Sequence, residues 1–113
     1  MIEKTLLDHL NGLLRDPVYL DIPAKPPVRY YKLEKTGSDE EDQIRSATFA
    51  LQSHGGSLLE TAKMNYLGIE AMRQAVRLRT VAHVVLDSDY NFTDTSQKQH
   101  RYQAVFHITH YEE

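Results

Sequence analysis

The sequence predicts an α+β fold: a mostly antiparallel four- to five-stranded sheet with two helices packed on one face, in the order α-(β)-β-β-α-β-β. Three observations predict it. They are an amphipathic segment at the N-terminus, a capped helix in the middle of the chain, and a final segment whose apolar residues alternate with a period of two. Placing both helices on the same face is the economical packing of these elements.

Residues 1–15 are expected to form the first helix. At 100° per residue their apolar side chains lie within an arc of about 140°. They are Ile2, Leu6, Leu7, Leu10, Leu13 and Leu14. Asp16-Pro17 should end the helix, because the residue before proline is disfavoured in the helical region. We expect a short edge strand at 18–20 and then an extended connector over 21–27, since three prolines there cannot donate ladder hydrogen bonds.

A long hairpin follows, with strands over 28–35 and 44–53 and a polar loop over 36–43 between them. In the second strand, Ala47, Phe49 and Leu51 share one face. Arg45 has the same parity but lies near the tip, where a charged side chain would extend beyond the core. The sheet is therefore expected to project past its helices.

The second helix is expected from Ser57 to about residue 76, because Ser57 and Glu60 have the spacing of a capping box. The preceding glycines, Gly55 and Gly56, would let the chain leave the strand at angles that other residues avoid. The expected main apolar stripe is Leu58, Ala62, Tyr66, Ile69, Met72 and Val76, flanked by the small residues Thr61, Gly68, Ala71 and Ala75.

The last third of the chain predicts two more strands. Residues 80–86 have the β-branched character of a buried strand, and 87–99 form a polar loop broken by two aromatic residues. Over 101–111 the alternation is strict, which marks a half-buried antiparallel strand. Its inward face is expected to carry Tyr102, Ala104, Phe106 and Ile108.

Composition limits the classes of function. The 113 residues fit a single domain, 1–113, with a formal charge of −3 and no cysteine. We therefore expect no disulfide, no thiolate metal site and no direct recognition of nucleic acid, and a reducing compartment. No apolar run approaches the roughly 20 residues that cross a bilayer, and no signal peptide is recognised.

No motif points to catalysis. The six histidines show no ligand spacing, and there is neither a cysteine nor a Gly-x-Ser-x-Gly turn. Gly55-Gly56-Ser57 lacks the lysine and the spacing of a phosphate-binding loop, so helix capping explains it better. We expect no enzyme activity, no catalytic residue, no metal and no cofactor.

Two loops and one strand carry candidate contact residues. The tip of the first hairpin is acidic, and it would either meet a partner or simply keep the tip solvated. The aromatic residues of the later polar loop would either anchor an interface or fold back on their own core. Two adjacent tyrosines on opposite faces of one strand suggest contacts between subunits. The candidates are Asp39, Glu40, Glu41 and Asp42, then Asp89, Tyr90 and Phe92, and for the subunit interface Tyr30 and Tyr31.

In this layout the chain resembles the tail terminator, or tail completion, proteins of long-tailed bacteriophages and prophages. The resemblance covers nearly the whole chain. It includes the N-terminal amphipathic helix, Asp16-Pro17-Val18-Tyr19, the polar hairpin, one long helix over 53–76, and the ending Ser88-Asp89-Tyr90-Asn91-Phe92 with Arg101-Tyr102-Gln103-Ala104-Val105-Phe106. That family has no catalytic signature to match.

The resemblance implies a homo-oligomeric ring of six subunits in the virion, at the head-proximal end of the tail. Such a ring caps the tail tube protein, ends its polymerisation and offers a surface to the head–tail connector proteins. A head–tail connector subunit of the neck is one alternative. Another is a small cytoplasmic ligand-binding or enzyme domain of ferredoxin-like type, which would use either the open face of the sheet or a cleft beside Tyr30, Tyr31 and His83.

Overall fold

The computed structural model describes residues 1–96 and 99–111 and confirms an α+β fold with a five-stranded, mostly antiparallel sheet and two α-helices. The elements are α1 (Ile2–Leu13), β1 (Val18–Tyr19), β2 (Tyr30–Glu41), β3 (Ile44–Gly55), α2 (Leu58–Arg73), the 3-10 helix η1 (Gln74–Arg77), β4 (Val81–Asn91) and β5 (His100–Tyr111). Residues 97 and 98 of the expected polar loop lie outside the described residues.

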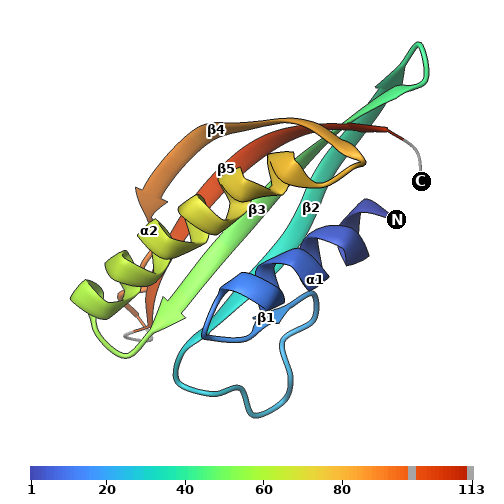
Figure 1. Cartoon of the computed structure of the whole chain (residues 1–113). Coiled ribbons are helices and arrows are strands. Elements are labelled where there is room, and N and C mark those ends of the chain that lie inside the picture. The colour runs from blue at the N-terminus through green and yellow to red at the C-terminus, as the bar shows by residue number, and fades with distance from the viewer. Residues whose placement is uncertain (97–98, 112–113) are drawn as a thin grey trace.

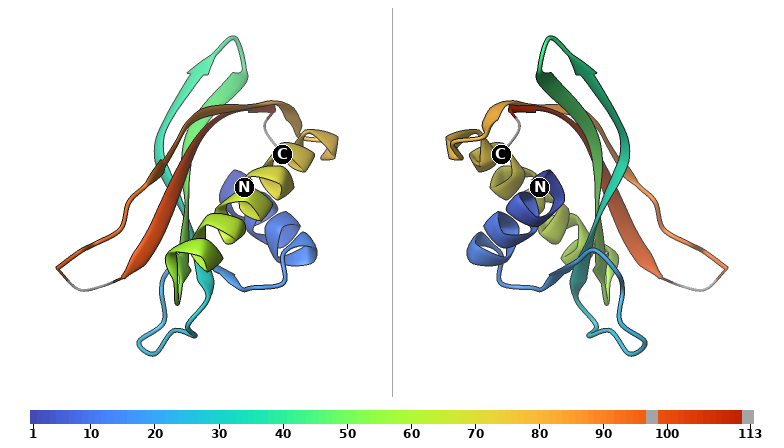
Figure 2. Two further views of the ribbon diagram at one scale, coloured as in Figure 1. Left: turned by 90° about the vertical axis from the view of Figure 1, so that its left-hand side faces the viewer. Right: turned by 90° about the vertical axis from the view of Figure 1, so that its right-hand side faces the viewer.

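The strands lie in the order β1-β2-β3-β5-β4, so that β5 is inserted between β3 and β4. Only the short β1 runs parallel to its neighbour, β2, and the other pairs are antiparallel. Both helices cover one face of the sheet and leave the other face open (Figures 1 and 2). Where the sheet extends past the helices, the β2–β3 hairpin projects furthest (Figure 1).

The core lies between the helices and the covered face. Its largest fully buried apolar side chains come from every layer: Leu6, Leu10, Tyr31, Leu33, Phe49, Leu51, Met72, Phe106 and Ile108. The alternation in β5 is confirmed, because Ala104, Phe106 and Ile108 are all buried whereas His107 is exposed. Burial of these side chains supplies most of the stabilisation of a cysteine-free fold.

Two strands are longer than the sequence predicted. β2 continues to Glu41 and β4 to Asn91, so the expected loop over 36–43 is a two-residue turn at Asp42-Gln43. Both turn residues have positive φ, 52° and 68°, as in the tight turns whose twist matches that of a hairpin. The prediction failed because backbone pairing with β3 and β5 extends these polar segments as strand although nearly all their side chains stay exposed.

The predicted stripe of α2 was wrong in part: Ile69 and Met72 are buried as expected, but Leu58 is 44% exposed. Tyr66 and Val76 are exposed, whereas Gly68, Ala71 and Ala75 from the flanking line face the sheet. Close approach explains the choice: a Cβ at Gly68 would lie 2.9 Å from Leu51 Cδ2.

The start of α2 is capped as expected, with one change. Ser57 Oγ accepts a hydrogen bond from the Glu60 N–H (3.2 Å), and Glu60 Oε1 accepts one from the Gly56 N–H (2.9 Å) rather than from Ser57. Neither Gly55 nor Gly56 has a positive φ. Gly55 is required by space instead, because a Cβ there would lie 2.5 Å from Thr61 Oγ1.

Candidate interaction surfaces

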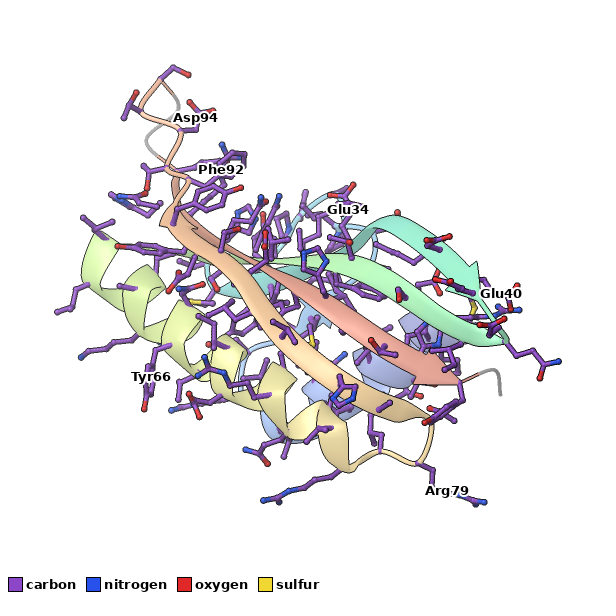
Figure 3. The ribbon with its side chains drawn as sticks, turned by 90° about the horizontal axis from the view of Figure 1, so that it is seen from above. Glu34, Glu40, Tyr66, Arg79, Phe92 and Asp94 are labelled. Carbon is purple, nitrogen blue, oxygen red and sulfur yellow. The ribbon has the colours of Figure 1, made fainter. Side chains whose placement is uncertain are left out.

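The candidate contact residues gather at two hairpin ends on opposite ends of the sheet. Glu40 marks one end and Phe92 the other (Figure 3). The β2–β3 turn follows the Ile44–Tyr111 pair, whereas Phe92 follows the Asn91–Tyr102 pair at the far end of β5. One rigid sheet therefore separates the two groups that the sequence had singled out.

The first end, the acidic tip, consists of Asp39, Glu40, Glu41 and Asp42, all exposed. Arg45 Nε lies 3.3 Å from Glu40 Oε1, and the Glu40 N–H donates to Asp39 Oδ1 at 2.8 Å. One cation thus offsets part of the charge of four neighbouring carboxylates, and the tip presents a negative field to any partner.

A hollow of about 810 Å³ lies between this projecting end of the sheet and the start of α1. Glu3 and Lys35 form an ion pair of 3.1 Å in its lining. Partial burial raises the pKa of Glu3, but the backbone hydrogen bond at Glu3 and the Lys35 ammonium lower it more, so the net shift is downward. This pair is the tie between α1 and the base of the acidic tip.

The second end, the aromatic end, consists of Tyr90, Phe92 and Arg101. The rings of Tyr90 and Phe92 meet edge to face, with centroids 6.1 Å apart, and the Arg101 guanidinium lies 4.6 Å from the Phe92 centroid. The two aromatic residues remain 41% and 38% exposed. They pack on each other and on an arginine rather than folding back into the core, which leaves their surface available to a partner.

Side-chain hydrogen bonds hold this aromatic end to the body of the sheet. The Gln52 amide donates to Gln103 Oε1 at 2.9 Å, and the Gln103 amide donates to the Tyr90 hydroxyl. On the covered face, the buried Asn65 of α2 donates to Asp89 Oδ1 at 2.6 Å. Asp89 is thus a link between helix and sheet as well as an exposed residue.

The two tyrosines expected at a subunit interface have separate places. They do lie on opposite faces of β2, but Tyr31 is only 1% exposed and its hydroxyl donates to the Met64 carbonyl at 2.8 Å. Burial raises its pKa, as expected of a core tyrosine. Tyr31 offers no surface to a second copy, so we correct that assignment.

Tyr30 lies on the open face, where its ring stacks on His54 with centroids 4.4 Å apart. Burial lowers the pKa of His54 to about 4, and Arg101 and Lys32 contribute in the same direction. His54 is therefore neutral near pH 7. Burial likewise raises the pKa of Tyr30, so this pair forms a neutral, mostly buried platform beside the aromatic end.

The alternative cleft beside Tyr30, Tyr31 and His83 is not formed. Tyr31 faces the core, and His83 pairs with Thr109, which lies beside Ser46 at the other end of β3 from His54. Eight strand residues separate the rows of Ser46 and His54, which is about 27 Å at 3.4 Å per residue. The three side chains cannot contact one ligand.

The open face does bring together one group that the sequence did not reveal. Thr48 Oγ1 lies 3.1 Å from His107 Nδ1, and His107 Nε2 lies 3.4 Å from Asp87 Oδ1. The order of hydroxyl, imidazole and carboxylate is that of a nucleophilic triad, but His107 and Asp87 are both more than half exposed. Water competes for every contact there, so these bonds act as cross-strand links.

A further exposed surface, also missed from the sequence, lies on the outer side of α2. Tyr66 points away from the sheet there and is 65% exposed (Figure 3). With Ala62, Lys63 and Leu67 it lines a shallow, mainly apolar hollow of about 390 Å³. The apolar surface of this hollow is smaller than that of most interaction sites, so we treat it only as part of the exposed face of α2.

Within the described ranges, 1–96 and 99–111, no three or more His, Cys, Asp or Glu side chains are grouped as a metal site would require, and no helix is long and apolar enough to span a bilayer. No model of a known protein family matches the sequence, and no curated protein matches it.

Proposed function

We propose that this protein is a structural subunit of a phage tail, a tail terminator that caps the head-proximal end of the tail tube and offers a joining surface to the head connector. It would act without any reaction. Its work would be to cover the surface on which further tube subunits add, and to bind the connector on its other side.

The observation that carries the proposal is the placement of two unlike contact surfaces at opposite ends of one sheet. The acidic tip and the aromatic end lie at the two extremes of the molecule, as Glu40 and Phe92 show (Figure 3). A terminator must bind two different proteins along one axis, the tube below and the connector above. Two chemically distinct ends joined by a rigid sheet meet that need.

Ring formation would supply the binding strength. Six copies repeat every weak contact around a closed symmetric interface, so that the total affinity greatly exceeds that of one subunit. The exposed outer side of α2 leaves room for contacts between neighbours.

The test is electron microscopy of particles assembled after deletion of this gene, scoring tail length and head attachment. Overlong or irregular tails without heads are the expected result. Tails of normal length lying apart from full heads would instead identify a neck connector. Normal particles would contradict both roles.

A further inference from the structure

We infer that the basic part of the outer face of α2, continued by η1, is the docking surface for the β2–β3 hairpin of a second copy of this chain. The inference rests on the proposed ring and names the surfaces that would close it. The contact is heterologous: each copy offers its hairpin to one neighbour and its helix face to the other.

The docking surface carries three arginines within seven residues: Arg73, Arg77 and Arg79, all exposed. Arg73 forms an ion pair with Glu70 at 3.1 Å, whereas Arg77 and Arg79 form no ion pair with any described residue. Val76, between them in the sequence, is 49% exposed. The surface thus combines positive charge with one branched apolar side chain.

The hairpin carries the complementary set. Its acidic tip has four carboxylates, of which Glu40 pairs with Arg45. Ile44 follows the turn directly and is 43% exposed. In a hairpin docked on the helix face, the carboxylates would face the arginines and Ile44 would face Val76. Both the charged and the apolar parts of the two surfaces would then be paired.

The positions of the two surfaces favour a contact between molecules. Both lie at the same end of the sheet, because the Tyr111 N–H donates to the Thr80 carbonyl (2.8 Å) beside the Ile44–Tyr111 pair. They lie on opposite edges, since β2 and β4 are separated by β3 and β5. Figure 3 shows Glu40 and Arg79 in these places.

Three strand spacings of about 4.8 Å put β2 roughly 14 Å from β4. Among the described residues, no ion pair joins the acidic tip to Arg73, Arg77 or Arg79. The tip acids and these arginines are therefore available to neighbouring copies. A head-to-tail ring requires two complementary surfaces on opposite edges of the sheet and at the same end of its strands. Rotation about the ring axis then places the hairpin of each copy on the helix face of the next, and the same contact repeats around the ring.

The first experiment traps the contact in the cysteine-free purified protein. Ile44→Cys with Val76→Cys leaves every charge in place and puts one thiol on each surface. On mild oxidation we expect a ladder of disulfide-linked species longer than dimers, at least about tenfold more abundant than in the control pair Val28→Cys with Val76→Cys, since steered docking raises the local concentration. Dimers alone, or equal ladders, would overturn a head-to-tail contact.

The second experiment exchanges the charges in the same cysteine background. One chain carries Asp39→Lys and Glu41→Lys, which spares the Asp42-Gln43 turn and the Glu40–Arg45 pair. The other carries Arg77→Glu and Arg79→Glu, which spares the Arg73–Glu70 pair. Each chain alone should lose at least about tenfold of the ladder, because like charges would then meet.

An equimolar mixture of the two chains should restore the ladder, because alternating copies again place opposite charges in contact at every interface. A chain with Lys4→Glu and Lys25→Glu has the same change of net charge as the chain with Arg77→Glu and Arg79→Glu, but away from the docking surface, and should keep its ladder. Circular dichroism checks that every variant is folded. If the mixture does not form the ladder, the inference is wrong even where gene deletion gives overlong tails. If the mixture restores the ladder, the docking contact is supported even where gene deletion does not give overlong tails.

Discussion

The two hairpin ends of the sheet differ in how they are held. The aromatic end is tied to the rest of the molecule on both faces, through Asn65–Asp89 and through the Gln52–Gln103–Tyr90 series. The acidic tip makes its described contacts within its own hairpin, such as Arg45–Glu40. Surface chemistry at the tip is thus separable from folding, whereas at the aromatic end the two are coupled.

The largest expected effect is on assembly. Replacement of Asp39, Glu40, Glu41 and Asp42 by Ser should lower the yield of infectious particles by roughly 10² or more, because a contact repeated around a ring is lost six times over. The unfolding free energy should fall by no more than about 1 kcal/mol, because all four side chains are exposed and only Asp42 of the four has a positive φ. Complementation of the deleted gene and thermal unfolding measure the two; full activity would remove the tip from the mechanism.

A matched variant sharpens the comparison. Tyr90→Ser with Phe92→Ser should also impair assembly, but electron microscopy should show the block at the other step: one variant gives overlong tails and the other gives finished tails without heads. If both stop at the same step, the two ends do not serve two different partners.

The next effect is on stability. Asp89→Ala should lower the unfolding free energy by about 1–3 kcal/mol, because it leaves the buried Asn65 amide without its acceptor. Denaturant unfolding of Asn65→Ala, Asp89→Ala and the double variant isolates the pair. Additive effects would mean that this tie contributes nothing to the aromatic end.

The aromatic end should also respond to pH. The pKa of His54 is lowered by burial to about 4, so between about pH 4 and 6.5 the unfolded chain binds a proton that the folded one does not. The contribution of His54 to the unfolding free energy is therefore fully present above about pH 6.5. It is lost as the pH falls from about 6.5 to 4, with a slope of at most about 1.4 kcal/mol per pH unit. His54→Gln should remove that part of the slope in unfolding measured across this range; an unchanged slope would contradict it.

The smallest effect is at the turn of the acidic tip. Asp42 and Gln43 both hold positive φ, a region where glycine is free of strain. Gln43→Gly should stabilise the hairpin by about 0.5–1 kcal/mol without affecting assembly. Hydrogen exchange at the tip amides should slow, while exchange at the aromatic end, as the internal control, should stay the same.

Local rules predicted most of the fold. The cap at Ser57, the alternation in β5 and the amphipathic α1 follow from spacing alone and are confirmed. The buried side of α2 could not be predicted, because apolar residues occur around most of the helix and closeness of approach at Gly68 decided which side packs. A hydropathy pattern does not show that glycine, which has no side chain, lets a helix and a strand approach closely.

The candidate surfaces were predicted in part. Charge and aromatic residues in polar segments pointed to Asp39–Asp42 and to Tyr90 and Phe92, and these are exposed. The Thr48–His107–Asp87 group comes from three strands, and only the register brings it together. The exposed residues of α2, such as Tyr66, were not predicted because hydropathy alone did not show which side of the helix packs on the sheet.

The insertion of β5 between β3 and β4 also affects how fast the chain folds. Gly55 pairs with His100 and Ile44 with Tyr111, so the centre of the sheet closes only over the long intervening stretch that contains α2 and β4. Non-local pairing of this kind slows folding toward milliseconds or longer. Until β5 arrives, β3 keeps an unpaired edge beside Phe49 and Leu51, and this open edge is where misassembly during synthesis would begin.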